Sequence, residues 1–247
     1  MKHVITFLMV AAVLSIASTA LAEVTLYETD FENPPFTIGN LVGQDGWANH
    51  SGSGSLIQVI AGQAAETVHG SGSREDANIS LGQTAVAGTV FGFAFDVIVS
   101  GAGAATTTYF AHLKDDGTGF NARVFVTAPN TGSNDFTFAI GETSSSTPAA
   151  IFATDFAYGR TYRLAGSYTF DTGISTLSVD GGTAINSSTQ ADPGEDLSFF
   201  AFRQSGGNTS QVIDNLVVTS NVPEPGTMGL LAVLGIVGVI RRRREQR

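Results

Sequence analysis

The chain has 247 residues, no cysteine, and 12 basic against 22 acidic residues, which give a formal net charge of −10. The central span Glu23–Ser220 carries six basic and 20 acidic residues, so its own net charge is near −14. Such a charge repels phosphate backbones and argues against a nucleic-acid partner. The lack of cysteine excludes zinc–thiolate sites, iron–sulfur clusters and cysteine nucleophiles.

The first segment, Met1–Ala22, is typical of a secretory signal peptide. Lys2 and His3 precede an apolar run from Val4 to Leu14, and small residues occupy the end of Ala20-Leu21-Ala22. A cationic start, a short apolar centre and an Ala-x-Ala end predict cleavage after Ala22 and export of the chain. The alternative is a buried N-terminal helix.

The body, residues 23–220, is predicted to be all-β. In TVFGFAFDVIV, the residues Phe91, Phe93, Phe95, Val97 and Val99 alternate with other residues and would share one strand face. The stretch FNARVFVTA would likewise place Phe120, Ala122 and Val124 on one side, and TYRLAGSYTF and QVIDNLVVTS have the same alternation.

Turn-forming triplets separate these runs, as at Asp115-Asp116-Gly117 and Asp180-Gly181-Gly182. About eleven to thirteen short strands with turns between them indicate one β-sandwich domain. SGSGS at 51–55 and GSGS at 70–73 are interpreted as surface loops, since neither is followed by the lysine and helix of a phosphate-binding loop.

The last segment, Val222–Arg247, has a different composition. Thr227–Ile240 is uncharged and would form a helix of about 21 Å, short for a hydrocarbon core of about 30 Å. Flanking arginines in the end 241–247 could snorkel and would hold the C-terminus in the cytoplasm. The alternative is a buried core helix.

This tail resembles the PEP-CTERM sorting signal of bacterial exported proteins. The resemblance rests on the motif, its spacing to the apolar run, the basic end and a companion signal peptide. It implies sorting to the cell envelope by an integral-membrane exosortase, at least transient anchoring by the apolar helix, and an association with exopolysaccharide and biofilm. The residues that carry it are Val222, Pro223, Glu224, Pro225, Arg241, Arg242, Arg243 and Arg244.

The body resembles the concanavalin A-like, laminin-G-like jelly roll. Leu26–Glu32 followed by Gly43–Trp47 is similar to its opening strand and loop, Tyr162–Gly181 to its antiparallel hairpin, and Val212–Val218 to its closing strand. The expected fold is therefore an antiparallel jelly-roll β-sandwich.

A structural Ca²⁺ ion is the cofactor that the sequence suggests. Because the first and last strands of a β-sandwich commonly lie close together, Asp30 and Glu32 would meet Asp214 and Asn215, and related jelly-roll modules often place calcium there. Calcium is bound by six to eight oxygen ligands of this kind. The turn Asp115–Gly119 is a second candidate, and hydrogen-bonded edge carboxylates and an ordinary turn are the alternatives.

Trp47, the single tryptophan, is the candidate ligand residue. Exposed aromatic faces beside polar groups bind sugars, and Gln44, Asp45 and His50 are near it in sequence. The alternative is a core plug beneath the first loop. Tyr109, Tyr158 and Arg160 are weaker candidates for the same role.

No catalytic residues are predicted. The laminarinase-like relatives of the fold carry Glu-x-Asp-x-x-Glu, which is absent here, and so is Gly-x-Ser-x-Gly. His50, His69 and His112 lack zinc-ligand spacing, and His112 is expected on a solvent face. We expect a non-catalytic, surface- or matrix-associated protein that binds glycan or is structural in extracellular polysaccharide. A polysaccharide hydrolase and a protein-binding adhesin are the alternatives.

Overall fold

The computed structural model describes residues 23–221, except 33, 53–55, 61–64, 68–73, 133–134, 143–146, 188–195 and 205. Within these ranges, Val24–Ser220 form one compact unit. The predicted signal peptide, sorting motif, apolar segment and arginine-rich end lie outside the described residues, as does His69. The described part contains no helix, and therefore none of a length and apolarity that would cross a membrane.

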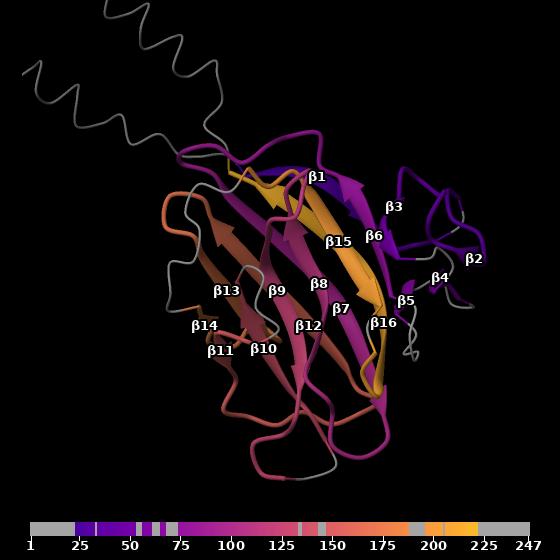
Figure 1. Ribbon diagram of the computed structural model, residues 1–247, viewed down its shortest axis with the longest axis vertical. Helices are drawn as coiled ribbons and strands as arrows, with labels where there is room; N and C mark the ends of the chain where they lie inside the picture. The colour runs from indigo at the N-terminus through magenta and orange to yellow at the C-terminus, as the bar shows by residue number, and fades with distance from the viewer. Residues whose placement is uncertain are drawn as a thin grey trace, which may run out of the picture. The chain divides into compact units, whose positions relative to one another are not determined.

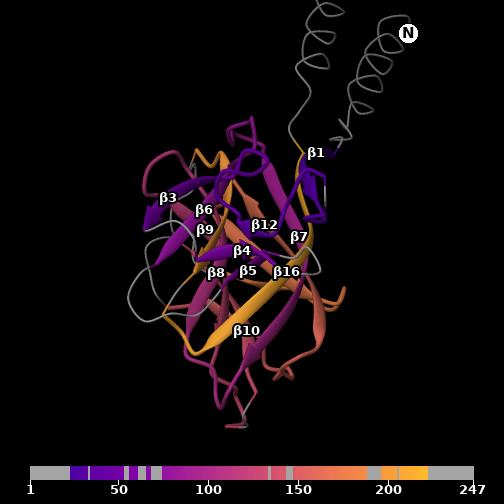
Figure 2. The same ribbon diagram turned by 90° about the vertical axis from the view of Figure 1, so that its right-hand side faces the viewer.

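One sheet of the described part has nine strands, all paired antiparallel. Its path begins with β14 (Ile185–Asn186), β13 (Ile174–Val179), β12 (Thr161–Thr169), β7 (Val90–Gly101) and β16 (Thr209–Ser220). It continues through β5 (Ala65–Thr67), β4 (Ile57–Val59) and β2 (Gly39–Asn40). The first strand, β1 (Val24–Thr29), pairs with β16 beside this path, and β5 lies next to β16, with β4 beyond it, in Figure 2.

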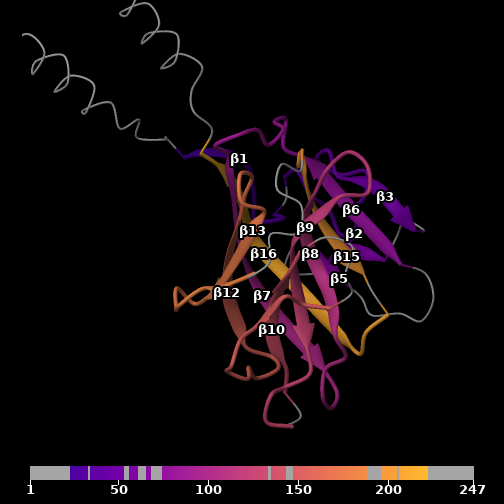
Figure 3. The ribbon, with the colours of Figure 1, turned by 60° about the vertical axis from the view of Figure 1, so that its left-hand side comes forward.

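The second sheet of the described part has seven strands, also antiparallel. Its order is β11 (Ala150–Ile151), β10 (Thr137–Gly141), β9 (Phe120–Thr127), β8 (Thr108–Lys114), β15 (Phe199–Gln204), β6 (Glu75–Ser80) and β3 (Ala48–Gly52). The two sheets form the two layers of a sandwich (Figures 1 and 3).

The core fills the space between the sheets and is rich in phenylalanine. Phe93 and Phe95 of β7 contact Phe200 of β15, with ring centroids 5.7 and 6.3 Å apart. Phe202 of β15 also reaches Phe95, at 6.3 Å. These tilted and edge-to-face contacts are the favoured geometry of aromatic pairs, and they supply the buried apolar area that a chain without disulfides needs.

The predicted all-β jelly-roll class is confirmed, and the long strands lie where the alternation placed them. The run at 91–99 lies within β7, and its five alternating side chains are buried. The described residues form 16 strands, more than the eleven to thirteen expected. The additional strands are two or three residues long, as in β2, β11 and β14, and so are too short to show an alternating pattern.

One detail of the β9 prediction is wrong. Leu113 and Ala111 of β8 pair with Asn121 and Val124 of β9, so β9 contains one extra residue there. Ala122 takes a φ of 49° at this β-bulge. The extra residue breaks the alternation, so Phe120 does not share the core face of Val124.

Candidate functional site

The first and last strands meet, as the sequence predicted. β1 pairs with the second half of β16, from Thr29 opposite Leu216 to Val24 opposite Ser220. A bulge in β16 between Asp214 and Val217 places Asn215 at a φ of 50°. Asp214 and Asn215 therefore lie where β16 passes from pairing with β5 to pairing with β1.

A groove of about 330 Å³ lies over this bulge. Its lining residues come from β1, β12 and β16, with one from the segment after β1: Glu28, Thr29, Asp30, Arg163, Asn215, Leu216 and Val217. The Arg163 guanidinium donates to the carbonyl oxygen of Asn215 at 2.8 Å and pairs with Asp96 at 3.3 Å. Asn215 Nδ2 donates to the other oxygen of Asp96 at 2.8 Å.

Three of the predicted metal ligands, Asp30, Glu32 and Asp214, are close enough for their charges to interact. Partial burial raises the pKa of Asp214, and the charges of Asp30, Asp96 and Glu32 raise it further. Asp30 Oδ1 accepts a hydrogen bond from its neighbour Glu32, whose N–H lies 3.0 Å away. No group of three or more acidic or histidine side chains in the described ranges is arranged to hold a metal ion. Calcium at Asp30, Glu32, Asp214 and Asn215 stays a prediction.

The second calcium candidate, the turn after β8, is already hydrogen-bonded within itself. Asp115 Oδ1 accepts from the N–H groups of Gly117 and Gly119 at 2.9 and 2.8 Å. The N–H of Asp115 donates to the carbonyl of Gly119 at 3.1 Å. These contacts are those of an aspartate that closes a hairpin turn.

Trp47 is a core plug. Its side chain is 2% exposed, it stacks on Phe202 with centroids 5.1 Å apart, and its Nε1 donates to Tyr27 Oη at 3.0 Å. A ring so covered presents no face to a saccharide, so the interpretation of Trp47 as a sugar platform is set aside.

Two of the weaker candidates, Tyr158 and Arg160, make contacts within the body. The hydroxyl of Tyr158 donates to the carbonyl of Gly103 at 2.9 Å, and its ring stacks on Phe136. Arg160 is exposed, lies over the ring of Tyr162, and is 3.8 Å from Asp180. Tyr109, by contrast, lies within a cluster that the sequence analysis did not find.

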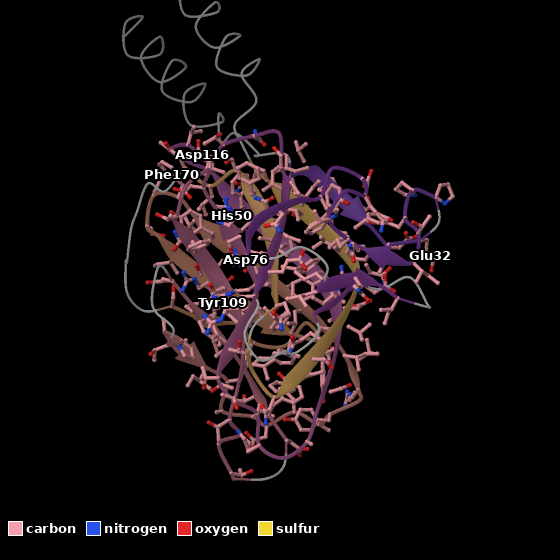
Figure 4. All side chains as sticks on the ribbon, turned by 45° about the vertical axis from the view of Figure 1, so that its right-hand side comes forward. Glu32, His50, Asp76, Tyr109, Asp116 and Phe170 are labelled. Atoms are coloured by element: carbon pink, nitrogen blue, oxygen red, sulfur yellow. The ribbon has the colours of Figure 1, made fainter. Side chains whose placement is uncertain are left out.

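This cluster covers the outer face of the seven-stranded sheet. Because Phe202 and Leu113 face the core, the neighbouring side chains of Arg203 and His112 point to the opposite face. We call the group the outer-face cluster, and its members are His50, Asp76, Tyr109, His112, Lys114, Phe120, Arg123, Phe199 and Arg203. Three of its members, His50, Asp76 and Tyr109, follow one another along this side of the molecule in Figure 4, away from Glu32.

Cations and aromatic rings alternate in the outer-face cluster. Tyr109 lies between two guanidinium groups, with Arg203 4.1 Å and Arg123 4.6 Å from its ring centroid. Arg123 also lies 5.0 Å from the ring of Phe120, and Lys114 Nζ lies 4.5 Å from the ring of Phe199. Each contact is within the range of a cation–π interaction.

The carboxylate that these cations share is Asp76. Arg203 Nε lies 3.4 Å from Asp76 Oδ1, and Ser51 Oγ donates to Asp76 Oδ2 at 2.6 Å. The charge of Asp76 also acts on Arg123 and Lys114. Burial nevertheless dominates, because it lowers the pKa of Arg123 to about 10 and lowers that of Lys114 and Arg203.

His112 is neutral in this setting. Burial holds its pKa well below the ordinary value, and the charges of Arg123 and Lys114 lower it further. The side chain is 0% exposed, which corrects the expectation of a solvent-facing histidine. Neither ring nitrogen has a hydrogen-bond partner among the residues that the structure describes.

Two strand irregularities explain why the outer-face cluster was missed. Phe120 and Arg123 are three residues apart, and so are Tyr109 and His112, which would put each pair on opposite faces of a regular strand. The bulge at Ala122 and a register shift between Tyr109 and Ala111 bring each pair to one face. A basic residue inside an apolar strand, as in FNARVFV and FFAFRQ, was the sequence signal available.

Comparisons with known proteins bear on the tail and the body separately. A family profile described as the PEP-CTERM protein-sorting motif matches residues 221–244. A search of curated protein sequences gave no significant match.

Solved structures similar to the body include several lectins. Peanut lectin is 13% identical, with a TM-score of 0.53 over 81% of this chain and 97% of its own. The lectin UEA-II, solved with galactose, is 13% identical, with a TM-score of 0.51 over 81% of this chain and 99% of its own. A sialidase has a TM-score of 0.51 at 13% identity over 70% of this chain, but this match spans 17% of the sialidase.

At these identities the likeness shows the fold, which these lectins share over nearly their whole length. The PEP-CTERM motif indicates an exported protein that is sorted to the cell envelope. The chain therefore joins a PEP-CTERM sorting motif at residues 221–244 to a body with a concanavalin A-like, lectin-type fold.

Proposed function

We propose that the protein is a non-catalytic glycan-binding component of the extracellular matrix or cell envelope. The observation that carries this proposal is the partly exposed part of the outer-face cluster, the rings of Tyr109, Phe120 and Phe199 on one sheet of a lectin-type fold. Sugars bind to such surfaces through their apolar C–H faces and their hydroxyl groups. The sorting motif supports delivery of this surface to the cell exterior, where polysaccharide is available.

A binding role rather than a catalytic one is supported by the contacts of Asp76. This carboxylate pairs with Arg203 and accepts a hydrogen bond from Ser51. Both of its oxygens therefore lie against neighbouring side chains of the protein. We therefore assign Asp76 to fixing the guanidinium of Arg203.

The delivery step includes two finer proposals. We propose that an exosortase-type membrane protease cuts the chain near Pro223-Glu224-Pro225, and that the apolar segment 227–240 anchors the chain in the membrane until then. Mass spectrometry of the exported protein tests this. Loss of the arginine-rich end from released material is expected, and released chains that still end at Arg247 would contradict it.

Glycan binding is tested with the exported protein on an array of neutral and acidic oligosaccharides. Saturable binding to at least one class is expected, without release of reducing sugar from a matching polysaccharide. If no saccharide is bound, the proposal fails, and a protein-binding adhesin becomes the better interpretation.

A hydrolase is the second candidate, and the groove over the β16 bulge is the observation that favours it. Asp30 lines that groove, and the raised pKa of Asp214 nearby is a property of general acids. Release of reducing sugar that Asp214→Asn abolishes would establish this function and refute the non-catalytic proposal.

A further inference from the structure

The two ends of the body meet in one strand pair. β1 is antiparallel to the end of β16, and its first residue, Val24, lies opposite Ser220, the last residue of β16. On its other side, the same end of β16 pairs with β7, where Ser220 lies opposite Phe91. The end of β16 is therefore held between two neighbouring strands up to its last residue.

The side chains at this end of β16 are buried. Val218 is 0% exposed and Ser220 is 1% exposed. The neighbouring β1 is held by Tyr27, which lies opposite Val218, accepts a hydrogen bond from Trp47 Nε1 and donates one to Asp45. Pulling the end of β16 out of the sheet would expose apolar surface and break hydrogen bonds between strands, so this opening costs free energy.

Both predicted processing positions flank this strand pair. A single residue separates Ala22, the predicted end of the signal peptide, from Val24. A single residue likewise separates Ser220 from Val222, where the sorting motif begins. The body therefore leaves almost no unpaired chain on the N-terminal side of the motif.

A protease that cuts at the motif needs more free chain than this. Proteases bind a substrate as an extended segment with several residues on each side of the bond that they cut, in the manner of an added strand. A cut near Pro223-Glu224-Pro225 would place Asn221, Ser220 and the residues before them in the enzyme, although β16 is paired up to Ser220. Because a paired segment becomes available only when it opens locally, the rate of cutting should follow the fraction of molecules in which this end is open.

Of the two strands that hold the end of β16, β1 is the one that opens more readily. β7 is paired along both of its edges, with β12 and β16, whereas β1 pairs with β16 alone among the described strands. At the beginning of β1, Val24 and Thr25 are exposed. Detachment of these residues would free the edge of β16 that leads to the motif, and the enzyme could then pair with that edge.

We propose that β1 controls the removal of the sorting tail, because the enzyme reaches the chain before the motif only after the first residues of β1 have left the edge of β16. This inference rests on the proposed exosortase cut and adds a conformational step that precedes it. The folded body then keeps its membrane attachment until this end opens, so the stability of one strand edge sets the time of release.

The test locks this end with a disulfide. Thr25 and Thr219 lie opposite each other, so Thr25→Cys/Thr219→Cys can join β1 to β16 in a chain that has no other cysteine. The full-length variant is incubated with membranes from cells that export the protein, and removal of the tail is followed by mass spectrometry. The oxidised variant should lose its tail at least about tenfold more slowly than the wild type, and prior reduction should restore the rate.

The matched control is a disulfide elsewhere on the same sheet, Ser167→Cys/Thr176→Cys, between two hydroxyls 2.7 Å apart on β12 and β13. It should leave the rate of tail removal within about twofold of the wild type. A flexible Gly-Ser insert between Asn221 and Val222 supplies unpaired chain directly, so it should speed tail removal at least about threefold and cancel the effect of the lock. Thermal unfolding shows whether each variant is folded.

The outcomes separate this inference from the proposed cut. If the wild-type chain keeps its tail in these membranes, the proposed cut fails, and this inference fails with it. If the oxidised lock and the wild type lose the tail at the same rate, the cut stands and the role of β1 is wrong. A lock that slows the reaction equally when the insert is present would also overturn the inference, because access to the chain before the motif would then not be the limiting step.

Discussion

Trp47 should make one of the largest single contributions of any side chain to the stability of the fold. The indole is 2% exposed and lies parallel to Phe202, with an interplanar angle of 6°. Its edge meets Tyr27, and Nε1 donates to Tyr27 Oη at 3.0 Å. Trp47→Ala removes all of these contacts and leaves a cavity, so we expect a loss of about 3–5 kcal/mol in the free energy of unfolding.

Trp47→Phe divides this loss into parts. The stacking on Phe202 is retained, while the second ring and the hydrogen bond to Tyr27 are lost. Tyr27 Oη still donates to Asp45 Oδ2 at 3.0 Å, so it keeps a partner, and a loss of about 1–2 kcal/mol is expected. A double-mutant cycle with Tyr27→Phe isolates the hydrogen bond at about 1 kcal/mol.

Urea unfolding followed by far-UV circular dichroism measures these free energies in every variant. In the wild type the single tryptophan also reports directly, because a buried indole emits at short wavelength and should not shift when saccharide is added. A loss below about 1 kcal/mol for Trp47→Ala would refute the core-plug assignment. Loss of saccharide binding at unchanged stability would instead restore the platform interpretation.

Three further predictions concern stability. Because His112 has a folded-state pKa below its unfolded value, its stabilising contribution is complete above about pH 6.5 and is lost as the pH falls, by up to about 1.4 kcal/mol per pH unit. In urea titrations from pH 7 to 5, His112→Asn should flatten this dependence of the unfolding free energy on pH. His50→Asn should keep most of it. Gly166→Ala places a Cβ 2.3 Å from Phe93 Cζ and should cost about 1–3 kcal/mol, and an unchanged Tm would show that the Phe93 ring can move aside. In the presence of a chelator, Asp214→Asn should raise Tm by on the order of 1 °C, since it removes a charge that Asp30, Asp96 and Glu32 disfavour. If calcium binds at this site, added calcium raises the Tm of the wild type and not of the variant. No response of Tm to calcium in either protein would disprove the calcium site.

The sequence was informative where alternation is long and uninterrupted. The five alternating residues of β7 and the hairpin of β12 and β13 were predicted because strand geometry repeats every two residues. The closeness of the first and last strands could be expected from general sandwich topology, and β1 indeed pairs with β16. The shortest strands carried too few residues to show a pattern.

The outer-face cluster could not be predicted because it depends on two irregularities. A strict period of two puts Phe120 and Arg123 on opposite faces, and the bulge at Ala122 reverses that. Sequence also does not reveal burial, so His112 was expected in solvent and Trp47 could be interpreted either as a platform or as a core residue. Which interpretation holds depends on strands distant in sequence, such as β15, which provides Phe202.

Hydrogen–deuterium exchange with a bound oligosaccharide tests the central claim of glycan binding most directly, because it locates the ligand on one sheet. Slower exchange is expected at 108–114, 120–127 and 199–204, the strands that carry the outer-face cluster. Protection at 24–30 and 214–217, around the groove over the β16 bulge, would contradict the account, and so would saturation with ligand that slows exchange in neither region.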